Sequence, residues 1–273
     1  VATTESRVAT LHRYRATALA NGVGELPWLT AQEVHQLEPA VACVRAIQSP
    51  LTGIVDSHAL MSAFLGDLEA ARGQVVCHSP VAGAAVHPEG FEVNVGGPEA
   101  CTIVCRDLVN SAGLTAPDLA RDLPASPGYA LPRQWFAKGH YYGLNGRSPF
   151  GRLVYPVAEA AGLGIHVTLD LGGRARFGPD VQWIDAIDYS FDDSRRARFV
   201  AAIRRYYPDL DPDRLQADYT GIRPKICGPD EPAADFRIDG PGAHGTSGLV
   251  HLMGIESPGL TACMAIGDHV VSL

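Results

Sequence analysis

Two stretches near the end of the chain decide how the rest is interpreted: Tyr219-Thr-Gly-Ile-Arg-Pro-Lys-Ile226 and His251-Leu-Met-Gly-Ile-Glu-Ser-Pro-Gly-Leu-Thr-Ala262. The first predicts a strand that carries the guanidinium of Arg223. The second predicts a helix start with Ser257 as N-cap and Pro258 in the first turn. A planar guanidinium can hold a carboxylate through two parallel hydrogen bonds, and the start of a helix accepts negative charge. The two stretches therefore predict a site for an anionic ligand.

The helix start also predicts what kind of ligand lies there. Because Gly259 has no side chain, a flat ligand can approach the backbone closely at this point. The free N–H groups of the helix start carry a partial charge of roughly +0.5, which stabilises the negative charge of a reduced flavin ring. The pairing of this helix start with Arg223 predicts a flavin site.

The chain resembles FAD-dependent oxidoreductases of the D-amino-acid oxidase type, most closely the L-2-hydroxyglutarate dehydrogenase branch. The resemblance begins with the Gly-Ile-Arg-Pro and Gly-Ile-Glu-Ser-Pro-Gly-Leu-Thr-Ala segments quoted above. It continues upstream through Pro50–Asp56, Asn110–Leu114, Lys138–Tyr142, Val154–Val157 and Leu163–Thr168. It thus spans nearly the whole chain, and it implies FAD as cofactor and a small carboxylate as substrate.

One element of the resemblance is missing. Members of this family begin with a strand, a Gly-x-Gly-x-x-Gly turn and a helix that hold the FAD pyrophosphate, and the chain has no matching turn. Gly22-Val-Gly24 lacks the third glycine and follows a predicted helix, so it is interpreted as a helix terminator. The chain starts at Val1, and we expect a processed, truncated or fragmentary N-terminus and an incomplete FAD-binding domain.

The order of predicted elements indicates a mixed α/β (α+β) fold with two interleaved domains. An antiparallel-sheet substrate domain is expected over residues 1–52 and 124–220. The FAD-binding domain is expected over residues 53–123 and 221–273, where an apolar strand, Cys101–Asn110, leads into the small-residue turn Ser111–Leu114.

Several predicted elements can be compared directly with a structure. Thr30-Ala-Gln-Glu33 is a capping box, and Asp56 is the expected N-cap of a helix to about Arg72. In that helix, Leu60, Phe64, Leu68 and Ala71 are spaced to form one buried face. Strands are also predicted at Gln74–Cys77 and Arg152–Val157, and a hairpin turn at Leu171–Gly173.

Composition excludes several classes of function. The 273 residues are 46% hydrophobic, enough for a packed core, and the net charge of −8 argues against nucleic-acid binding. No apolar run is long enough to cross a membrane, so we expect a cytoplasmic protein or one peripheral to a membrane. The six cysteines lack metal-ligand or disulfide-framework spacing, and we expect neither zinc nor disulfides.

The resemblance also implies roles for individual residues. Arg223 would hold the substrate carboxylate, while His166 would contact the substrate and, in our own inference, take the hydroxyl proton. Thr168 would assist by hydrogen bonding. Lys138 and Tyr142 alternate with Gly139 and Tyr141 along a predicted strand, and we expect one of these two sets to line the substrate pocket. The implied FAD contacts are Val81 at the adenine; Ala112, Gly113 and Leu114 along the dinucleotide; and Gly259, Leu260 and Thr261 at the isoalloxazine.

The favoured function is oxidation of L-2-hydroxyglutarate to 2-oxoglutarate by hydride transfer to flavin. The electron acceptor is left open among oxygen, a quinone and an electron-transfer protein. One alternative is an amine oxidase of the glycine-oxidase or D-amino-acid type, in which Arg223 has the same role. The other is a non-catalytic remnant that does not bind FAD, since each lost charge-assisted hydrogen bond to the phosphates weakens binding by about 1.5–3 kcal/mol.

Overall fold

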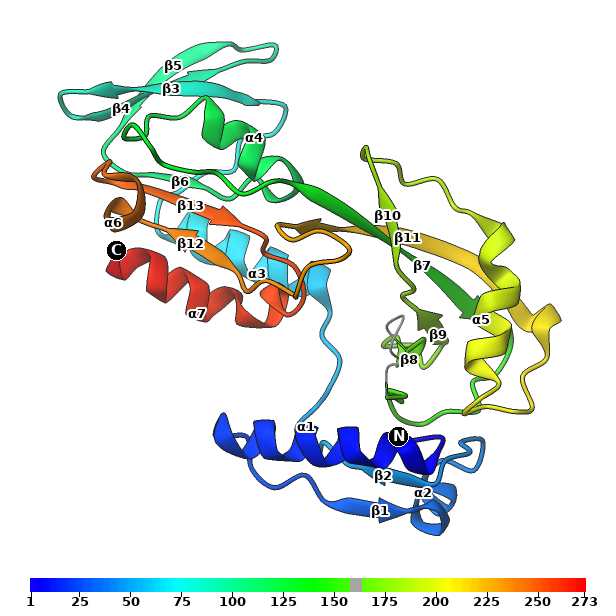
Figure 1. Ribbon diagram of the computed structural model, residues 1–273. Coiled ribbons are helices and arrows are strands. Elements are labelled where there is room, and N and C mark those ends of the chain that lie inside the picture. The colour runs from blue at the N-terminus through cyan, green and yellow to red at the C-terminus, as the bar shows by residue number, and fades with distance from the viewer. Residues whose placement is uncertain (158–163) are drawn as a thin grey trace. The chain divides into compact units, whose positions relative to one another are not determined.

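The computed structural model describes residues 1–157 and 164–273, and the chain divides into two compact units. Unit 1 consists of Val1–Phe64, Lys138–Gln182 and Tyr189–Gly221. Unit 2 consists of Leu65–Ala137, Trp183–Asp188 and Ile222–Leu273. Each unit is therefore assembled from three separate segments of the chain (Figure 1). The mixed α/β character that the sequence predicts is confirmed.

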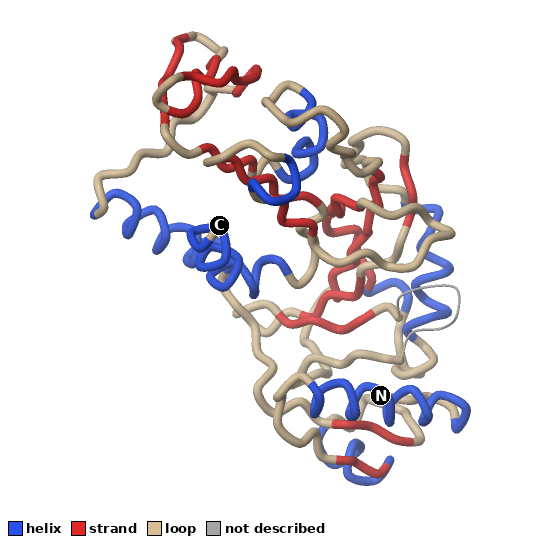
Figure 2. The backbone as a smooth tube through the Cα atoms, turned by 60° about the vertical axis from the view of Figure 1, so that its left-hand side comes forward, coloured by secondary structure: helices blue, strands red, loops and turns tan. Residues whose placement is uncertain are grey.

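Unit 1 begins with a small layer in which helix α1 (Val8–Ala20) lies beside a two-stranded antiparallel sheet of β1 (Trp28–Thr30) and β2 (Arg45–Ile47) (Figure 2). Helix α2 (Ala31–Leu37) follows β1 directly. Its predicted capping box is confirmed: the Glu33 N–H donates to Thr30 Oγ1 at 3.2 Å, and the Thr30 N–H donates to the Glu33 carboxylate at 2.7 Å. This reciprocal pair satisfies two donors at the helix start.

A five-stranded sheet has most of its residues in unit 1, while the start of β7, most of β10 and the end of β11 belong to unit 2. Its order is β10–β7–β9–β8, and β11 also pairs with β7. The strands are β7 (Trp135–Leu144), β8 (His166–Leu169), β9 (Ala175–Gly178), β10 (Gln182–Ile184) and β11 (Leu215–Lys225), and helix α5 spans Arg196–Ile203. The predicted hairpin turn is confirmed, with the Gly173 N–H donating to the Asp170 carbonyl at 2.9 Å. The main core lies in this unit and includes Tyr142, Phe177, Phe199, Tyr206 and Leu215.

Unit 2 contains two three-stranded sheets with helix α4 (Ala116–Arg121) between them (Figure 1). One is antiparallel: β3 (Val81–His87), β4 (Gly90–Val95) and β5 (Cys101–Cys105). The other has the order β12 (Arg237–Asp239), β13 (Leu249–Met253) and β6 (Leu108–Asn110), and β13 and β6 run parallel. Its further helices are the short α6 (Pro241–His244) and the C-terminal α7 (Gly259–Ser272); α3 (Ser57–Ala70) spans the division between the units. A second core forms around Phe91, Val93, Leu123 and Leu249.

Three predicted strands are corrected. The Cys101–Asn110 stretch is two strands in two different sheets, because β5 pairs with β4 while β6 pairs with β13. The stretch Gln74–Cys77 forms no strand. Within Arg152–Val157 only Val154 pairs, through an isolated bridge to Val167. Whether such a stretch forms a strand depends on the pairing partner that the fold makes available, which local β propensity does not give.

The buried face predicted for α3 is wrong, although its predicted cap is confirmed. The Ala59 N–H donates to Asp56 Oδ1 at 3.0 Å. None of the fourteen residues of α3 is buried, and both Phe64 and Leu68 are 38% exposed. The apolar spacing is present, but no other described element covers this face. Amphipathic periodicity shows which side of a helix can be buried, but it does not show whether another element packs against that side.

Candidate functional site

A cluster of charged residues surrounds Arg223 in unit 2. The Glu256 carboxylate lies 3.3 Å from the Arg223 guanidinium and also pairs with the Lys225 ammonium. Both cations come from β11, and Glu256 follows β13. The side chains of Arg223 and Glu256 are 27% and 13% exposed, so the pair is partly screened from water. Two cations and one anion leave a net charge of about +1, which suits the binding of a carboxylate.

The start of α7 lies just beyond Glu256, and it differs in detail from the prediction. The helix begins at Gly259 with Pro258 at the N-cap position and no side-chain cap, so the expected Ser257 cap is wrong by one residue. The Gly259 N–H donates to the Glu256 carbonyl, which closes a turn before the helix. Gly259 is buried, and a Cβ there would lie 2.6 Å from the Ile255 side chain. Close packing against Ile255 thus also requires glycine at this position.

The turn after β6 is held by one buried side chain. Asn110 Oδ1 accepts from the Ala112 N–H at 3.2 Å, and Asn110 Nδ2 donates to the Ala116 carbonyl at 2.8 Å. Gly113 has φ +59°, and apart from its chain neighbours no described residue has an atom within 4 Å of where its Cβ would be. An open backbone at the carboxyl end of a strand that runs parallel to its neighbour is where α/β sheets bind nucleotides.

These observations test whether the predicted FAD residues suit the cofactor. Leu260 and Thr261 are exposed in the first turn of α7, where N–H groups lack helical partners. Val81 is 39% exposed at the first position of β3, and Leu114 follows the open Gly113 in the turn after β6. All seven predicted FAD residues belong to unit 2, and those around Gly113 and Leu260 fit contact with a flat, anionic ligand.

The substrate residues predicted in β8 lie on the outer face of the sheet in unit 1. Thr168 pairs with Arg176, and Arg176 pairs with Gly143, which places these residues on one face. His166 shares that face by alternation along β8. The His166 ring is edge-on to Tyr155, with 4.3 Å between ring centroids. His166 and Thr168 are both partly exposed.

Lys138 and Tyr142 occupy the opposite, buried face. Tyr142, Phe177 and Val167 lie in register across β7, β9 and β8, and all three are fully buried. The Tyr142 hydroxyl donates to Asp193 at 2.9 Å, and burial together with this bond raises the pKa of Tyr142. The Lys138 ammonium donates to the Ser190 carbonyl at 2.9 Å and is 3% exposed. Their surroundings indicate a role in packing and not in substrate contact.

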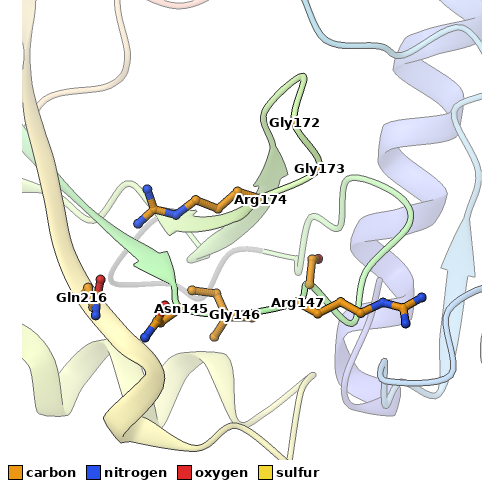
Figure 3. Close-up of a pocket in the computed structure, with 9 residues that line it drawn as sticks. Asn145, Gly146, Arg147, Gly172, Gly173, Arg174 and Gln216 are labelled. Atoms are coloured by element: carbon orange, nitrogen blue, oxygen red, sulfur yellow. The ribbon is translucent and has the colours of Figure 1, made fainter.

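A cavity of about 530 Å³ lies wholly within unit 1 but contains none of the predicted site residues. The turn after β7, the β8–β9 hairpin and Gln216 of β11 line it (Figure 3). The side chains of Arg174 and Arg147 point in different directions (Figure 3), so they do not converge on one ligand. The residues that line the cavity belong to unit 1, whereas the Arg223 cluster belongs to unit 2.

Tyr141, from the alternative set on β7, lies on the same face as His166 and stacks on Tyr219 with ring centroids 4.4 Å apart. Sequence reasoning missed two residues that the structure brings into these sites. Glu256 lies in a quoted motif but received no role, and its two cationic partners are visible only in three dimensions. His251 contacts Asn110 and is fully buried. A histidine inside the apolar strand Leu249–Met253 was the available signal, because buried polar residues are uncommon there.

Neither a metal site nor a membrane-spanning helix is found in the part of the chain that the structure describes. No group of three or more His, Cys, Asp or Glu side chains could hold a metal ion within residues 1–157 and 164–273. Over the same residues, no helix combines the length and apolar character needed to cross a membrane.

Comparison with known proteins gives consistent results along the whole chain. The sequence model of the DAO family, described as FAD dependent oxidoreductase, matches residues 1–273. A mitochondrial L-2-hydroxyglutarate dehydrogenase of Arabidopsis thaliana is 35% identical over all of this chain and 65% of its own length. An L-2-hydroxyglutarate dehydrogenase of Salmonella houtenae is 26% identical over all of this chain and 71% of its own length. The chain thus spans about two thirds of the length of these relatives.

Solved structures show the same fold. An L-alpha-glycerophosphate oxidase of Mycoplasma pneumoniae, solved with FAD bound, has a TM-score of 0.82 and 22% identity, covering 99% of this chain and 70% of that chain. A glycine oxidase of Geobacillus kaustophilus has a TM-score of 0.76 and 19% identity, covering 100% and 70%. The fold is thus shared among oxidases named for different substrates.

Proposed function

Because the chain belongs to the DAO family of FAD-dependent oxidoreductases, we propose that it oxidises an L-2-hydroxy acid, with L-2-hydroxyglutarate and 2-oxoglutarate as the substrate pair. The observation that carries this proposal is the 35% identity, across the whole chain, to a relative named for that reaction. The glycine oxidase likeness lies at 19% identity and supports the fold alone.

Arg223 is the proposed partner of the substrate carboxylate. Its guanidinium has five N–H donors, and the 3.3 Å contact with Glu256 leaves others free for a second carboxylate. Glu256 holds the guanidinium in one orientation, and Lys225 keeps the cluster cationic. A guanidinium that is already oriented loses less side-chain entropy when it binds a ligand than one that is free to rotate.

His166, in unit 1, is the proposed acceptor of the hydroxyl proton, and Thr168 a hydrogen-bonding assistant. The lone pair of an imidazole nitrogen is suited to accept a proton from a hydroxyl group. The two residues alternate on the exposed face of β8, which supports ligand contact over packing. Lys138 and Tyr142 are not retained, because both are buried on the other face.

The residues proposed to hold FAD are those of the turn after β6 and of the start of α7. Gly113 offers an open backbone, and Leu260 and Thr261 offer N–H groups at the positive end of the helix dipole. When bound, FAD supplies a two-electron acceptor for the hydrogen on the hydroxyl-bearing carbon. The chain's own residues would orient the acid, remove its proton and stabilise negative charge at the helix start.

Anaerobic bleaching of the flavin absorbance tests the substrate. The purified protein is incubated with FAD, freed of excess cofactor and mixed with L-2-hydroxyglutarate. D-2-hydroxyglutarate is the matched control, since it has the same charge and composition, and glycine and D-alanine test the amine-oxidase alternative. Bleaching by the L-acid alone is expected. If only the amines bleach the flavin, the proposed substrate is wrong; a protein that takes up no FAD would be the non-catalytic remnant.

The variant Arg223→Lys tests the carboxylate partner. Lysine keeps the charge but loses the planar fork, so we expect KM for the acid to rise by roughly 10- to 100-fold, the value of one charge-assisted hydrogen bond. Tyr142→Phe is the control, because it keeps the buried ring and removes only a hydroxyl that is already bound to Asp193, and KM should stay within about twofold. An unchanged KM in Arg223→Lys would remove Arg223 from the proposal.

A further inference from the structure

A row of polar side chains crosses the β12–β13–β6 sheet of unit 2. Asp239 pairs in register with His251, and His251 pairs with Asn110. Cross-strand neighbours point to the same face of a sheet. His251 and Asn110 are 0% and 2% exposed, so their polar atoms are almost removed from water. Buried polar groups of this kind are costly unless they are paired, and their pairing is therefore specific.

The backbone fixes which way the Asn110 amide faces. Its Oδ1 lies 3.2 Å from the Ala112 nitrogen, which is a donor, and its Nδ2 lies 2.8 Å from the Ala116 carbonyl, which is an acceptor. A flipped amide would oppose donor to donor and acceptor to acceptor at the same two positions. The NH₂ group must therefore also face His251, whose Nδ1 lies 3.2 Å away.

This orientation determines the tautomer of His251. An NH₂ group donates only, so Nδ1 of His251 must be the unprotonated, accepting nitrogen, and the proton lies on Nε2. Burial, followed by the neighbouring His244, lowers the pKa of His251 to about 4, and the ring is accordingly neutral at pH 7. Nε2 is buried and has no hydrogen-bond partner among the described residues.

The His251 ring is held on its other sides by aromatic neighbours. Tyr129 stacks on it with centroids 5.9 Å apart and ring planes inclined by 11°, and His244 meets it edge to face at 5.2 Å. The Tyr129 hydroxyl donates to Asp239 at 2.6 Å. Packing between the two rings and His251 holds His251 beside Asn110, and a phenylalanine at position 129 would keep that packing.

We propose that His251 is a positioning residue that acts through Asn110 to fix the backbone turn of residues 112–116. The Asn110 side chain forms hydrogen bonds with both ends of this turn, and His251 Nδ1 accepts the second N–H of the Asn110 amide. The turn contains Ala112, Gly113 and Leu114, the dinucleotide contacts of the proposed function. The inference about FAD rests on that proposed function, whereas the inference about the turn does not.

Two variants separate the hydrogen bond from the bulk of the ring. His251→Phe keeps an aromatic ring but has no acceptor for Asn110. His251→Asn carries its Oδ1 at the same branch point as Nδ1, so it restores an acceptor in a smaller side chain. If His251 only fills space, His251→Phe should be tolerated better than His251→Asn. If His251 positions Asn110, His251→Asn should be tolerated better than His251→Phe.

The first measurements need no cofactor. We expect the ¹⁵N spectrum of the His251 ring in the parent protein to show the proton on Nε2. We expect hydrogen exchange of the Ala112 amide to accelerate by roughly fivefold in His251→Phe, the value of one neutral hydrogen bond, and to return to within about twofold of the parent in His251→Asn. A proton on Nδ1, or unchanged exchange in His251→Phe, would overturn the proposal.

FAD titration provides the second measurement. The dissociation constant should rise by at most about fivefold in His251→Phe, the value of the same hydrogen bond, and recover to within about twofold in His251→Asn. Tyr129→Phe is the matched control, because it removes the bond to Asp239 in the same cluster and leaves the contact between His251 and Asn110; its FAD affinity should match the parent. Equal affinity in all variants would refute the link to FAD. If the parent takes up no FAD, the proposed function fails, and the tautomer and exchange results still decide the positioning role.

Discussion

Replacing Asp180 by alanine should destabilise unit 1 by about 4 kcal/mol. Asp180 is 3% exposed and connects β7 with the segment before α5. Its Oδ1 accepts from the His140 backbone N–H at 2.8 Å and lies 3.0 Å from His140 Nδ1, while its Oδ2 pairs with the Arg195 guanidinium. One carboxylate thus satisfies three groups, all of them largely buried.

The expected magnitude follows from what the substitution leaves behind. Removing one partner of a buried ion pair costs about 3–5 kcal/mol, and a buried N–H without an acceptor costs about 1–3 kcal/mol. These two costs are not additive, because the groups belong to one network, and Arg195 keeps its 3.1 Å bond to the Val181 carbonyl. The expected total cost is therefore about 4 kcal/mol, below the sum of the upper values. Asp180→Asn keeps one accepting oxygen for the His140 N–H and should cost about half as much.

Hydrogen exchange of peptides from β7 and β9 measures this free energy locally. Local exchange is preferable to a global melting curve because the chain has two units that need not unfold together. Glu25→Ala is the matched control: it breaks the Arg15–Glu25 pair, whose carboxylate side chain is 79% exposed, and should cost less than about 1 kcal/mol. If Asp180→Ala costs no more than Glu25→Ala, the network does not stabilise the unit and the reasoning is wrong.

Three further predictions concern stability. Burial lowers the folded-state pKa of His251 to about 4, so between pH 4 and about 6.5 the unfolded chain binds more protons than the folded chain. The free energy of unfolding should therefore fall on acidification through this window, by as much as about 3 kcal/mol. Thermal midpoints measured against pH should show a smaller fall in His251→Asn. Gly178→Ala should cost more than about 2 kcal/mol in urea unfolding, because Gly178 has φ +146° and a Cβ would lie 2.6 Å from the His140 carbonyl oxygen. Gly113→Ala should cost about 1–2 kcal/mol, because Gly113 has φ +59° and open space around the position of the Cβ. Equal costs for the two variants would contradict the steric argument. Tyr142→Phe should cost about 1 kcal/mol in the same assay through loss of the bond to Asp193, and a cost near zero would mean that water replaces the hydroxyl as the donor to Asp193.

Features that depend on a few consecutive residues were predictable from the sequence. The Thr30 capping box, the Asp56 cap and the Gly172-Gly173 hairpin all form as expected, because each is determined by hydrogen bonds within four residues. The Ser257 cap is off by one residue, since the turn closed between Glu256 and Gly259 delays the start of the helix.

Features that depend on distant partners were not predictable. The Cys101–Asn110 stretch looks like one apolar strand, but its two halves pair with β4 and β13, which lie in different sheets. The α3 periodicity indicates a buried face that no described element covers. In the candidate site, Arg223 is evident from its motif, whereas Glu256 and His251 acquire their roles through contacts with residues 31 to 141 positions away in the chain.

The interleaved order of the segments constrains how this chain reaches its native state on the ribosome. The core of unit 1 joins Val34 and Val41 to Phe199 and Leu215, so it cannot close until residue 215 has been synthesised. Before that point, the apolar residues of its first segment lack their packing partners. Contacts so distant in sequence slow folding and lengthen the period in which aggregation or chaperone capture competes with it. Unit 2 likewise needs its segment Ile222–Leu273, so each unit becomes complete only after the first segments of both have been synthesised.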